Sequence, residues 1–396
     1  MRPPALHSYL LWRSSVEPDA ASLAKWRWTA AASLLPAAMV GIFVFGWYAT
    51  ALLLVCLACA LVADWACQRW IFRGPAGPRD GTWLLAGLLV GLFLPPQVPW
   101  WVAACGAAAA VVLGKHWLSV DGMPLLRPAA VGLLLLHVLF LPYMHPQAQV
   151  RGQRVAQWPV LAWPFAAPKA GSDEPLGRYV VRQFLRRDIR RSVDRQTYQD
   201  EQFGYRQPMF DAKAGVQADA VFGPRPLDLA RDNPHRALSD LPRPNRYETL
   251  DVLLGYTAGP IGGASTLALL FGILLLLFAG AVPWLIPVFA LLTLGAGLTL
   301  TQNANVGIHL LSGPTLLGFF YLAADPGTTP RTKRGKILAG ITLGLLEFVL
   351  RFFLSEAIFL CAPAVQALSF VFDQYVAPPR HSGAPGSHES PPLGHI

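Results

Sequence analysis

Residues 265–300 have the sequence STLALLFGILLLLFAGAVPWLIPVFALLTLGAGLTL, which contains no charged side chain. A helix that crosses the hydrocarbon core of a bilayer needs about 20 mostly apolar residues. The stretch is long enough for two such helices, and the Gly280–Ala281 pair separates its two apolar runs. It therefore predicts two consecutive membrane-spanning helices.

The same pattern recurs along the chain. Hydrophobic residues make up 54% of the sequence and charged residues only 14%, whereas a soluble domain carries about 25% charged residues. The charges gather in the loops between apolar runs, which is typical of a bilayer protein. Apolar segments are expected at 29–46, 48–67, 82–94, 99–117, 128–144, 264–279, 282–300, 306–324, 336–352 and 354–376.

These segments predict an all-α integral membrane protein with about ten transmembrane helices and a long external insertion. Five crossings lie on each side of the insertion, and because five is odd, a repeat of the two halves would be inverted. The short run 82–94 before Pro95-Pro96 and the glycine-rich stretch 255–263 predict broken helices around a midplane site. The expected divisions are 1–28, 29–144, 145–249, 250–376 and 377–396.

Loop charges predict the orientation. Arginine and lysine occur in the N-terminal segment and in the loops after the second, fourth and eighth crossings, and cytoplasmic loops carry such an excess. Both termini are therefore expected in the cytoplasm of a bacterium, with 145–249 outside its inner membrane. The net charge of +9 is explained first by the basic loops of this topology. Because 145–249 is expected outside the cell, we expect no nucleic-acid partner. The Pro/Gly/Ser/His-rich tail 377–396 is expected to be disordered.

The external segment contains one periodic stretch, 176–195, in which apolar residues recur at helical spacing. Its opposite face is basic. Three interpretations remain: this face lies on an anionic membrane surface, docks an acidic partner, or is simply solvated. The residues expected to dock are Arg182, Arg186, Arg187, Arg190 and Arg191.

Five ionisable residues are candidates for an ion or proton pathway, because charges inside a membrane usually face the protein interior or a wet cavity. Glu347 and Arg351 are four residues apart, Glu356 follows at the next turn, and His137 and His309 occupy the two halves. The alternatives are a structural ion pair for Glu347 and Arg351 and hydrogen-bonded helix packing for the histidines.

The cysteines offer a weaker candidate. Cys56 and Cys59 share one helix face, and Cys67 or Cys105 could complete an iron–sulfur cluster. The alternative is that cysteine serves as a small apolar residue in a packed helix. The alternative is favoured, and no metal site is predicted.

Several motifs, in order, resemble the RnfD/NqrB family of membrane subunits of Rnf and Na⁺-translocating NADH:quinone oxidoreductase complexes. Arg127-Pro-Ala-Ala resembles the family's Asn-Pro-Ala-Ala motif, with arginine in place of asparagine. The other matching stretches are 80–101, 261–269, 308–313 and 324–330.

The resemblance implies ten helices in two inverted halves, in a subunit that passes electrons across the bilayer via flavin, coupled to Na⁺ or H⁺ movement. Other membrane subunits of the complex would be its partners. Alone it would catalyse nothing, since the family's electron-entry domains lie on other chains.

The sequence departs from the family at the covalent flavin. The family attaches FMN through phosphate to the threonine of a Ser-Gly-Ala-Thr motif, and the matching stretch here is Phe222-Gly223-Pro224-Arg225. Arginine cannot form that phosphoester, so we predict no covalent FMN. A noncovalent FMN or riboflavin is the alternative, held by Arg225 through its bidentate fork. Further candidate contacts are Phe222, Gly223, Ser265, Thr266, His309, Asp325, Thr328 and Thr329.

Three hypotheses of function follow. The first is the electron-transport subunit, favoured by the stretches 261–269 and 324–326. The second is a redox-inactive scaffold or pore that binds partners through its external segment, favoured by Arg225. The third is a solute channel like a urea transporter, for which the sequence offers few intramembrane polar residues. Asp325–Pro330 equally fits a turn, with Pro326, Gly327 and Pro330 as breakers.

Overall fold

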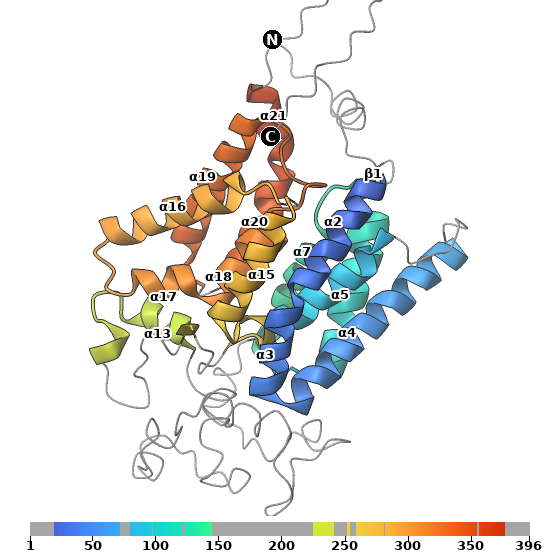
Figure 1. The fold of residues 1–396 in the computed structure, drawn as a ribbon, viewed down its shortest axis with the longest axis horizontal. Helices are drawn as coiled ribbons and strands as arrows, with labels where there is room; N and C mark the ends of the chain where they lie inside the picture. The colour runs from blue at the N-terminus through green and yellow to red at the C-terminus, as the bar shows by residue number, and fades with distance from the viewer. Residues whose placement is uncertain are drawn as a thin grey trace, which may run out of the picture.

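The computed structural model describes residues 20–71, 80–96, 98–120, 123–144, 225–240, 252–253, 259–280, 282–354 and 356–376. Within these ranges the regular secondary structure is helical, apart from two antiparallel strands of two residues each, β1 (Ser119–Val120) and β2 (Met123–Pro124). Figure 1 shows the helices of the first half, in blue to green, beside those of the second half, in yellow to red. The expectation of an all-helical architecture is thus confirmed in outline.

In the described residues of the first half, the chain forms seven α-helices and two π-helical segments. They are α2 (Ala20–Ser33), α3 (Leu35–Phe45), α4 (Trp47–Ala66), η1 (Cys67–Ile71), α5 (Thr82–Phe93), α6 (Trp100–Ala109), η3 (Ala110–Trp117), α7 (Pro128–Leu139) and α8 (Leu141–Met144). Small residues let them approach closely: the backbone of α7 at Gly132 packs against Ala110 and the Gly106 carbonyl.

The described part of the insertion holds α13 (Pro226–Asp232) and the 3₁₀ turn η8 (Leu238–Asp240). The second half follows with η9 (Ile261–Gly263), α15 (Thr266–Phe278), α16 (Leu285–Leu300), α17 (Val306–Leu311), α18 (Gly313–Leu317), η10 (Gly318–Ala323), α19 (Lys333–Leu350), α20 (Ile358–Ala367) and α21 (Ser369–Val376). In Figure 1, α13 lies beside α17 at the opposite end of the molecule from α21.

Two helices of the described part are long and apolar enough to cross a membrane: Ser22–Phe45 with 24 residues and Ala49–Trp70 with 22. The first begins earlier than the expected 29, because the mixed residues before it continue the helix and bury Trp26. Six further apolar helices are shorter, between 10 and 17 residues. Ten crossings in inverted halves therefore stay a prediction.

Broken helices meet at the centre of the fold. Helix α5 ends before Pro95-Pro96, and the Leu94 carbonyl accepts a hydrogen bond from the Ile261 N–H at 3.0 Å. A second break, inside the expected segment 306–324, falls at Ser312, whose backbone is extended. Gly313 then packs directly on the backbone of Gly263, with no room for a side chain between them. The predicted interruptions near 94 and 260 thus lie together.

Candidate functional site

Arg351 is the centre of a buried polar group that also contains Glu347, His309 and Thr315, here called the Arg351 cluster. Arg351 Nη2 donates to Glu347 Oε1 and to Thr315 Oγ1, both at 2.8 Å. Its Nη1 donates to the His309 carbonyl at 3.0 Å and lies 3.3 Å from His309 Nδ1. Glu347 is fully buried and Arg351 is 3% exposed, so the two charges neutralise each other away from water.

Local structure explains this cluster. Residues four apart on a helix share one face, which brings Glu347 in α19 and Arg351 at its C-cap together. The His309 carbonyl lies in the last turn of α17, where carbonyls lack intrahelical partners, and Arg351 and Thr315 supply the donors. The structural ion pair named as the alternative is formed. Thr315 was missed, since a single threonine in an apolar run carries no signal of its own.

Arg225 and Glu356, assigned to two different roles from the sequence, form one ion pair. Arg225 Nη1 lies 2.6 Å from Glu356 Oε1, its Nε lies 3.2 Å from Asp228 Oδ2, and its Nη2 donates to the Met144 carbonyl at 3.3 Å. Burial alone would lower the pKa of Arg225, but the two carboxylates outweigh it and raise the pKa above its usual value. Phe222 and Gly223 lie outside the described residues.

This position does not fit a covalent flavin. Arg225 has no hydroxyl to carry a phosphoester, and its guanidinium already binds two carboxylates. A phosphate would have to compete with Glu356 for the same donors. Glu356 therefore competes with the noncovalent flavin that the sequence predicted at Arg225.

Arg225 and Asn305 hold residues 225–240, here called the docked segment, onto the helical part. The Asn305 amide nitrogen donates to the carbonyls of Asn233 at 3.0 Å and Arg236 at 2.8 Å, and its oxygen accepts from the Leu238 N–H at 3.0 Å. Such backbone contacts fix the segment beside α17 independently of the ion pair.

A second polar group, here called the Arg127 site, lies at the turn between η10 and α19. The Arg127 guanidinium lies 4.9 Å from the centre of the Trp26 ring, and its Nη1 is 3.7 Å from Asp325 Oδ2. The backbone N–H groups of Thr328 and Thr329 donate to the Asp325 carbonyl at 3.1 and 3.0 Å. Three predicted residues thus come together with Arg127, which the sequence had singled out only as a departure from the family motif.

Four buried donor atoms of the Arg127 site have no hydrogen-bond partner among the described residues: Arg127 Nη1 and Nη2, Trp26 Nε1 and Thr328 Oγ1. Leaving a buried donor unsatisfied costs about 1–3 kcal/mol. Burial lowers the pKa of Arg127 to about 10, partly offset by Asp325, so the guanidinium stays charged at neutral pH. The site fits a ligand that supplies hydrogen-bond acceptors, as the carbonyls or phosphate of a flavin do.

The remaining predicted residues serve helix junctions. Ser265 caps α15 by accepting from the Ala268 N–H, and it donates to the Leu253 carbonyl at 3.0 Å. Thr266 donates to the Leu311 carbonyl at 2.6 Å. His137 Nδ1 is 2.8 Å from the Leu133 carbonyl, and its ring stacks on Phe359 at 3.8 Å. These contacts match the packing alternative, and a functional role for them stays a prediction.

The two other groups of predicted residues are the arginines of 176–195 and the cysteines. The basic face with Arg182, Arg186, Arg187, Arg190 and Arg191 lies outside the described residues. Cys56 is buried and its Sγ lies 3.8 Å from the Ala103 carbonyl. The described ranges contain no group of three or more His, Cys, Asp or Glu that could hold a metal ion.

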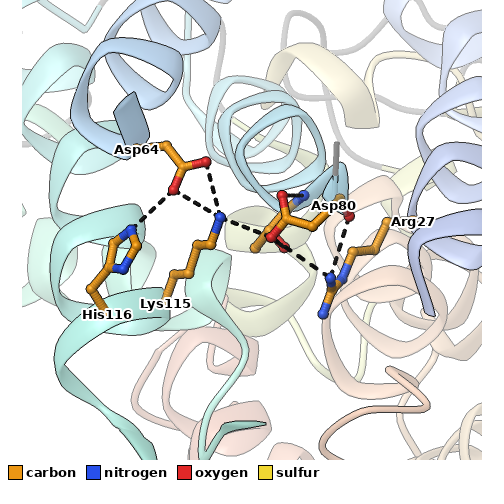
Figure 2. Close-up of polar contacts among 6 residues, drawn as sticks. Arg27, Asp64, Asp80, Lys115 and His116 are labelled. Carbon is orange, nitrogen blue, oxygen red and sulfur yellow. Dashed lines mark hydrogen bonds and ion pairs between the residues drawn. The ribbon is translucent and has the colours of Figure 1, made fainter. Parts of the chain in front are cut away.

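An ionic network around Asp64 was missed from the sequence (Figure 2). Lys115 Nζ lies 2.8 Å from a carboxylate oxygen of Asp64 and 2.8 Å from one of Asp80, and His116 Nε2 is 3.0 Å from Asp64. Arg27 Nη1 donates to the Asp80 carbonyl at 3.3 Å. The network joins α2, α4, η3 and the start of α5. The available signal was a single aspartate inside the apolar run 48–67.

Replacing Asp64 by asparagine should destabilise the protein by about 2–3 kcal/mol, because removing one partner of a buried ion pair costs about 3–5 kcal/mol and Lys115 keeps Asp80 as a partner. Chemical unfolding of the full chain in detergent micelles measures this. Asp232→Asn, which breaks the more exposed pair with Arg231, is the matched control and should change little. Equal effects of the two substitutions would contradict the assignment.

Comparison with known proteins finds the same family that the sequence motifs resemble. The model of the NQR2, RnfD, RnfE family matches residues 14–379. The D subunit of the ion-translocating oxidoreductase complex of Halorhodospira halophila is 30% identical over 353 residues, covering 87% of each chain. The D subunit of the proton-translocating ferredoxin:NAD(+) oxidoreductase complex of Clostridium ljungdahlii is 24% identical over 337 residues, covering 83% of this chain and 82% of its own.

A third relative carries a different ion in its name. The D subunit of the Na(+)-translocating ferredoxin:NAD(+) oxidoreductase complex of Acetobacterium woodii is 24% identical over 323 residues, covering 81% of this chain and 78% of its own. The family match spans well over half of the sequence and includes both helical halves and the Arg127 site. The chain belongs to the NQR2, RnfD, RnfE family.

Proposed function

We propose that this chain is a membrane subunit of an ion-translocating electron-transport complex and passes electrons across the bilayer through a noncovalently bound flavin. The family match and the relatives named as D subunits of such complexes support the first part. The unsatisfied donors of the Arg127 site carry the second part. The other subunits of the complex are its partners.

The residues of the Arg127 site would bind the flavin. Arg127, Trp26 and Thr328 would donate hydrogen bonds to its acceptor atoms, and the turn that begins at Asp325 would hold Thr328 in place. Gln366 fixes the Arg127 backbone by accepting its N–H at 3.0 Å. When bound, the flavin supplies the electron-accepting group. We propose no covalent FMN, since Arg225 offers no hydroxyl.

The ion pathway is proposed to run along the ionisable residues of the second half. Glu347, Arg351 and Glu356 are buried, and buried ionisable groups in a membrane commonly mark ion routes. His137 is the candidate in the first half. Relatives are named for protons and for sodium, so either ion suits the family. The arginines of 176–195 remain the proposed docking face for an acidic partner or lipid.

Orientation follows from the basic loops. Both termini and the Arg127 site would face the cytoplasm of the bacterial inner membrane, and the docked segment would face outside. Exposed tryptophans at the helix ends, among them Trp70, Trp117, Trp100 and Trp284, suit the two membrane interfaces, where this side chain is enriched.

The absorption spectrum of the purified chain, before and after acid precipitation, tests the proposal. We expect a flavin absorption band in the visible spectrum of the native protein, and free flavin in the supernatant after precipitation. Flavin retained in the pellet would mean covalent attachment and would contradict the proposed role of residue 225.

The second candidate is a redox-inactive scaffold of the same fold. The Arg225–Glu356 ion pair favours this candidate. At the position where the family attaches flavin, this chain has a structural contact instead. On this hypothesis a folded, monodisperse preparation contains no flavin in either fraction, while the chain still co-purifies with partner subunits.

A further inference from the structure

One face of α19 carries basic side chains at its start and a row of exposed apolar side chains after them. Lys333 and Arg334, in the first turn of the helix, are exposed. Residues three or four apart share one helix face, and Leu338 follows Arg334 by four positions. The apolar row consists of Leu338, Ile341, Leu345 and Val349. Together with the two cations, this row is here called the α19 face.

The α19 face is not covered by the part of the chain that the structure describes. Helix α19 packs on α16 through another side, where Gly340 and Gly344 lie against the carbonyls of Ile286 and Ala290. In the apolar row, Leu345 is 54% exposed. In a membrane subunit, such a face lies against lipid or against another subunit.

The two cations have no acidic partner in the described ranges. Neither Lys333 nor Arg334 forms an ion pair with another described residue. The carboxylate of Asp373, in α21, accepts hydrogen bonds from the backbone N–H groups of Arg331 at 3.0 Å and Thr332 at 3.3 Å. Asp373 thereby fixes the start of α19 and leaves the charge of the two exposed side chains to an anion from outside the chain.

The dimensions of the α19 face fit one leaflet of a bilayer. At a rise of about 1.5 Å per residue, the helix from Leu338 to Val349 is about 16 Å long. This is close to half of the hydrocarbon core, which is about 30 Å thick. Arg334 lies one helical turn beyond Leu338, about 6 Å further along the axis. The apolar row therefore matches the acyl chains of one leaflet, and the basic end matches its headgroups.

We propose that the α19 face binds an anionic phospholipid, with the phosphate at Lys333 and Arg334 and an acyl chain along the apolar row. A guanidinium fork matches phosphate oxygens, and a lysine binds phosphate as a point charge. Each basic side chain near an anionic membrane surface favours binding about fivefold, so two favour an anionic over a zwitterionic lipid up to about 30-fold. The inference needs only the membrane location of the chain and does not depend on its electron-transport role.

Photocrosslinking in vesicles tests this. The full chain, with the subunits that co-purify with it, is reconstituted into phosphatidylcholine vesicles. These contain a small fraction of a phosphatidylglycerol or a phosphatidylcholine probe with a diazirine in its acyl chain. Trypsin cuts after Lys336 and Arg351 and releases residues 337–351, which carry the whole apolar row but neither cation. We expect the phosphatidylglycerol probe to label this peptide at least about 10-fold more than the phosphatidylcholine probe does.

The same digest contains an internal control. Residues 247–331 form one tryptic peptide, and its stretch 265–300, which includes α15, has no charged side chain. Helix α15 also exposes large apolar side chains, among them Leu267, Phe271 and Phe278. Labelling within α15 should differ less than about twofold between the two probes, because no cation selects the headgroup there.

Two double variants examine the cations. Lys333→Gln/Arg334→Gln removes both charges, and the preference for phosphatidylglycerol in residues 337–351 should fall to within about twofold. Lys333→Arg/Arg334→Lys keeps both charges and should retain most of the preference. Because both side chains are exposed, the variants are expected to fold. If the glutamine variant does not, the ratio of the two probes in residues 337–351 and in α15 of the wild type still decides.

The outcomes that overturn the inference are specific. Equal labelling of residues 337–351 by the two probes would do so, as would a preference that survives the double glutamine variant. Labelling of the isolated chain that disappears when the co-purifying subunits are present would show that a partner subunit covers the α19 face. This result would also overturn the inference. Each of these outcomes leaves the proposed electron-transport role intact.

Discussion

An Arg351→Met variant of the full chain is expected to lose about 3–5 kcal/mol of its free energy of unfolding, the usual effect of removing one partner from a buried ion pair. Glu347 is fully buried and would keep an uncompensated carboxylate. The His309 carbonyl would keep the Thr315 hydroxyl as its donor, whereas Thr315 Oγ1 would lose the hydrogen bond that it accepts from Arg351. Each unsatisfied acceptor adds to the cost.

Unfolding in mixed micelles with increasing denaturant measures this effect. The double variant Glu347→Leu/Arg351→Met should recover most of the loss, since exchanging a whole buried pair for apolar residues is often neutral. Arg231→Met removes a pair with Asp232 that is part-exposed and should change little. A loss below about 1 kcal/mol in Arg351→Met would mean that the cluster is hydrated and the pair weak.

The same double variant separates the two interpretations of the Arg351 cluster. If Glu347 carries an ion or a proton, the stable double variant assembles into the complex but no longer supports ion translocation. If the pair is only structural, translocation persists once stability is restored. The i, i+4 spacing predicted the pair from the sequence, but spacing alone could not tell these roles apart.

Sequence and structure agree best where local rules decide. Pro95-Pro96 predicted the end of α5, and the structure ends that helix at Phe93. The break at Ser312 was not predicted, because Gly313-Pro314 lies in an apolar run whose hydropathy is continuous. Both breaks contact η9, through Leu94 and through Gly313. These contacts join segments that are far apart in the chain, and hydropathy carries no information about them.

In the polar sites, too, local contacts were predictable and contacts between distant segments were not. The sequence shows directly that position 225 carries no hydroxyl to which a flavin could be attached. The partner of Arg225, Glu356, is 131 residues away, and no periodicity in the sequence relates the two. Asp325, Thr328 and Thr329 were expected together because they share one turn. Their neighbours Trp26 and Arg127 come from other helices, so the unsatisfied donors that define the site become visible only in three dimensions.

The docked segment provides the second large effect. Glu356→Gln should raise the rate of amide hydrogen exchange in residues 229–240 about 30- to 160-fold, as expected from a loss of about 2–3 kcal/mol in local stability. The loss is smaller than for Arg351 because Arg225 keeps Asp228 and the Met144 carbonyl as partners. The Leu238 amide, which donates to Asn305, is the most informative probe.

Two variants sharpen this measurement. Asn305→Ala removes three hydrogen bonds to the docked segment without changing any charge, and at about 1 kcal/mol each it should accelerate exchange to a similar extent. Asp240→Asn, at an exposed position, is the control and should leave exchange unchanged. If Glu356→Gln leaves exchange in 229–240 unchanged while Asn305→Ala raises it, the ion pair contributes nothing to docking. The proposal that Glu356 outcompetes a flavin phosphate for Arg225 would then be wrong.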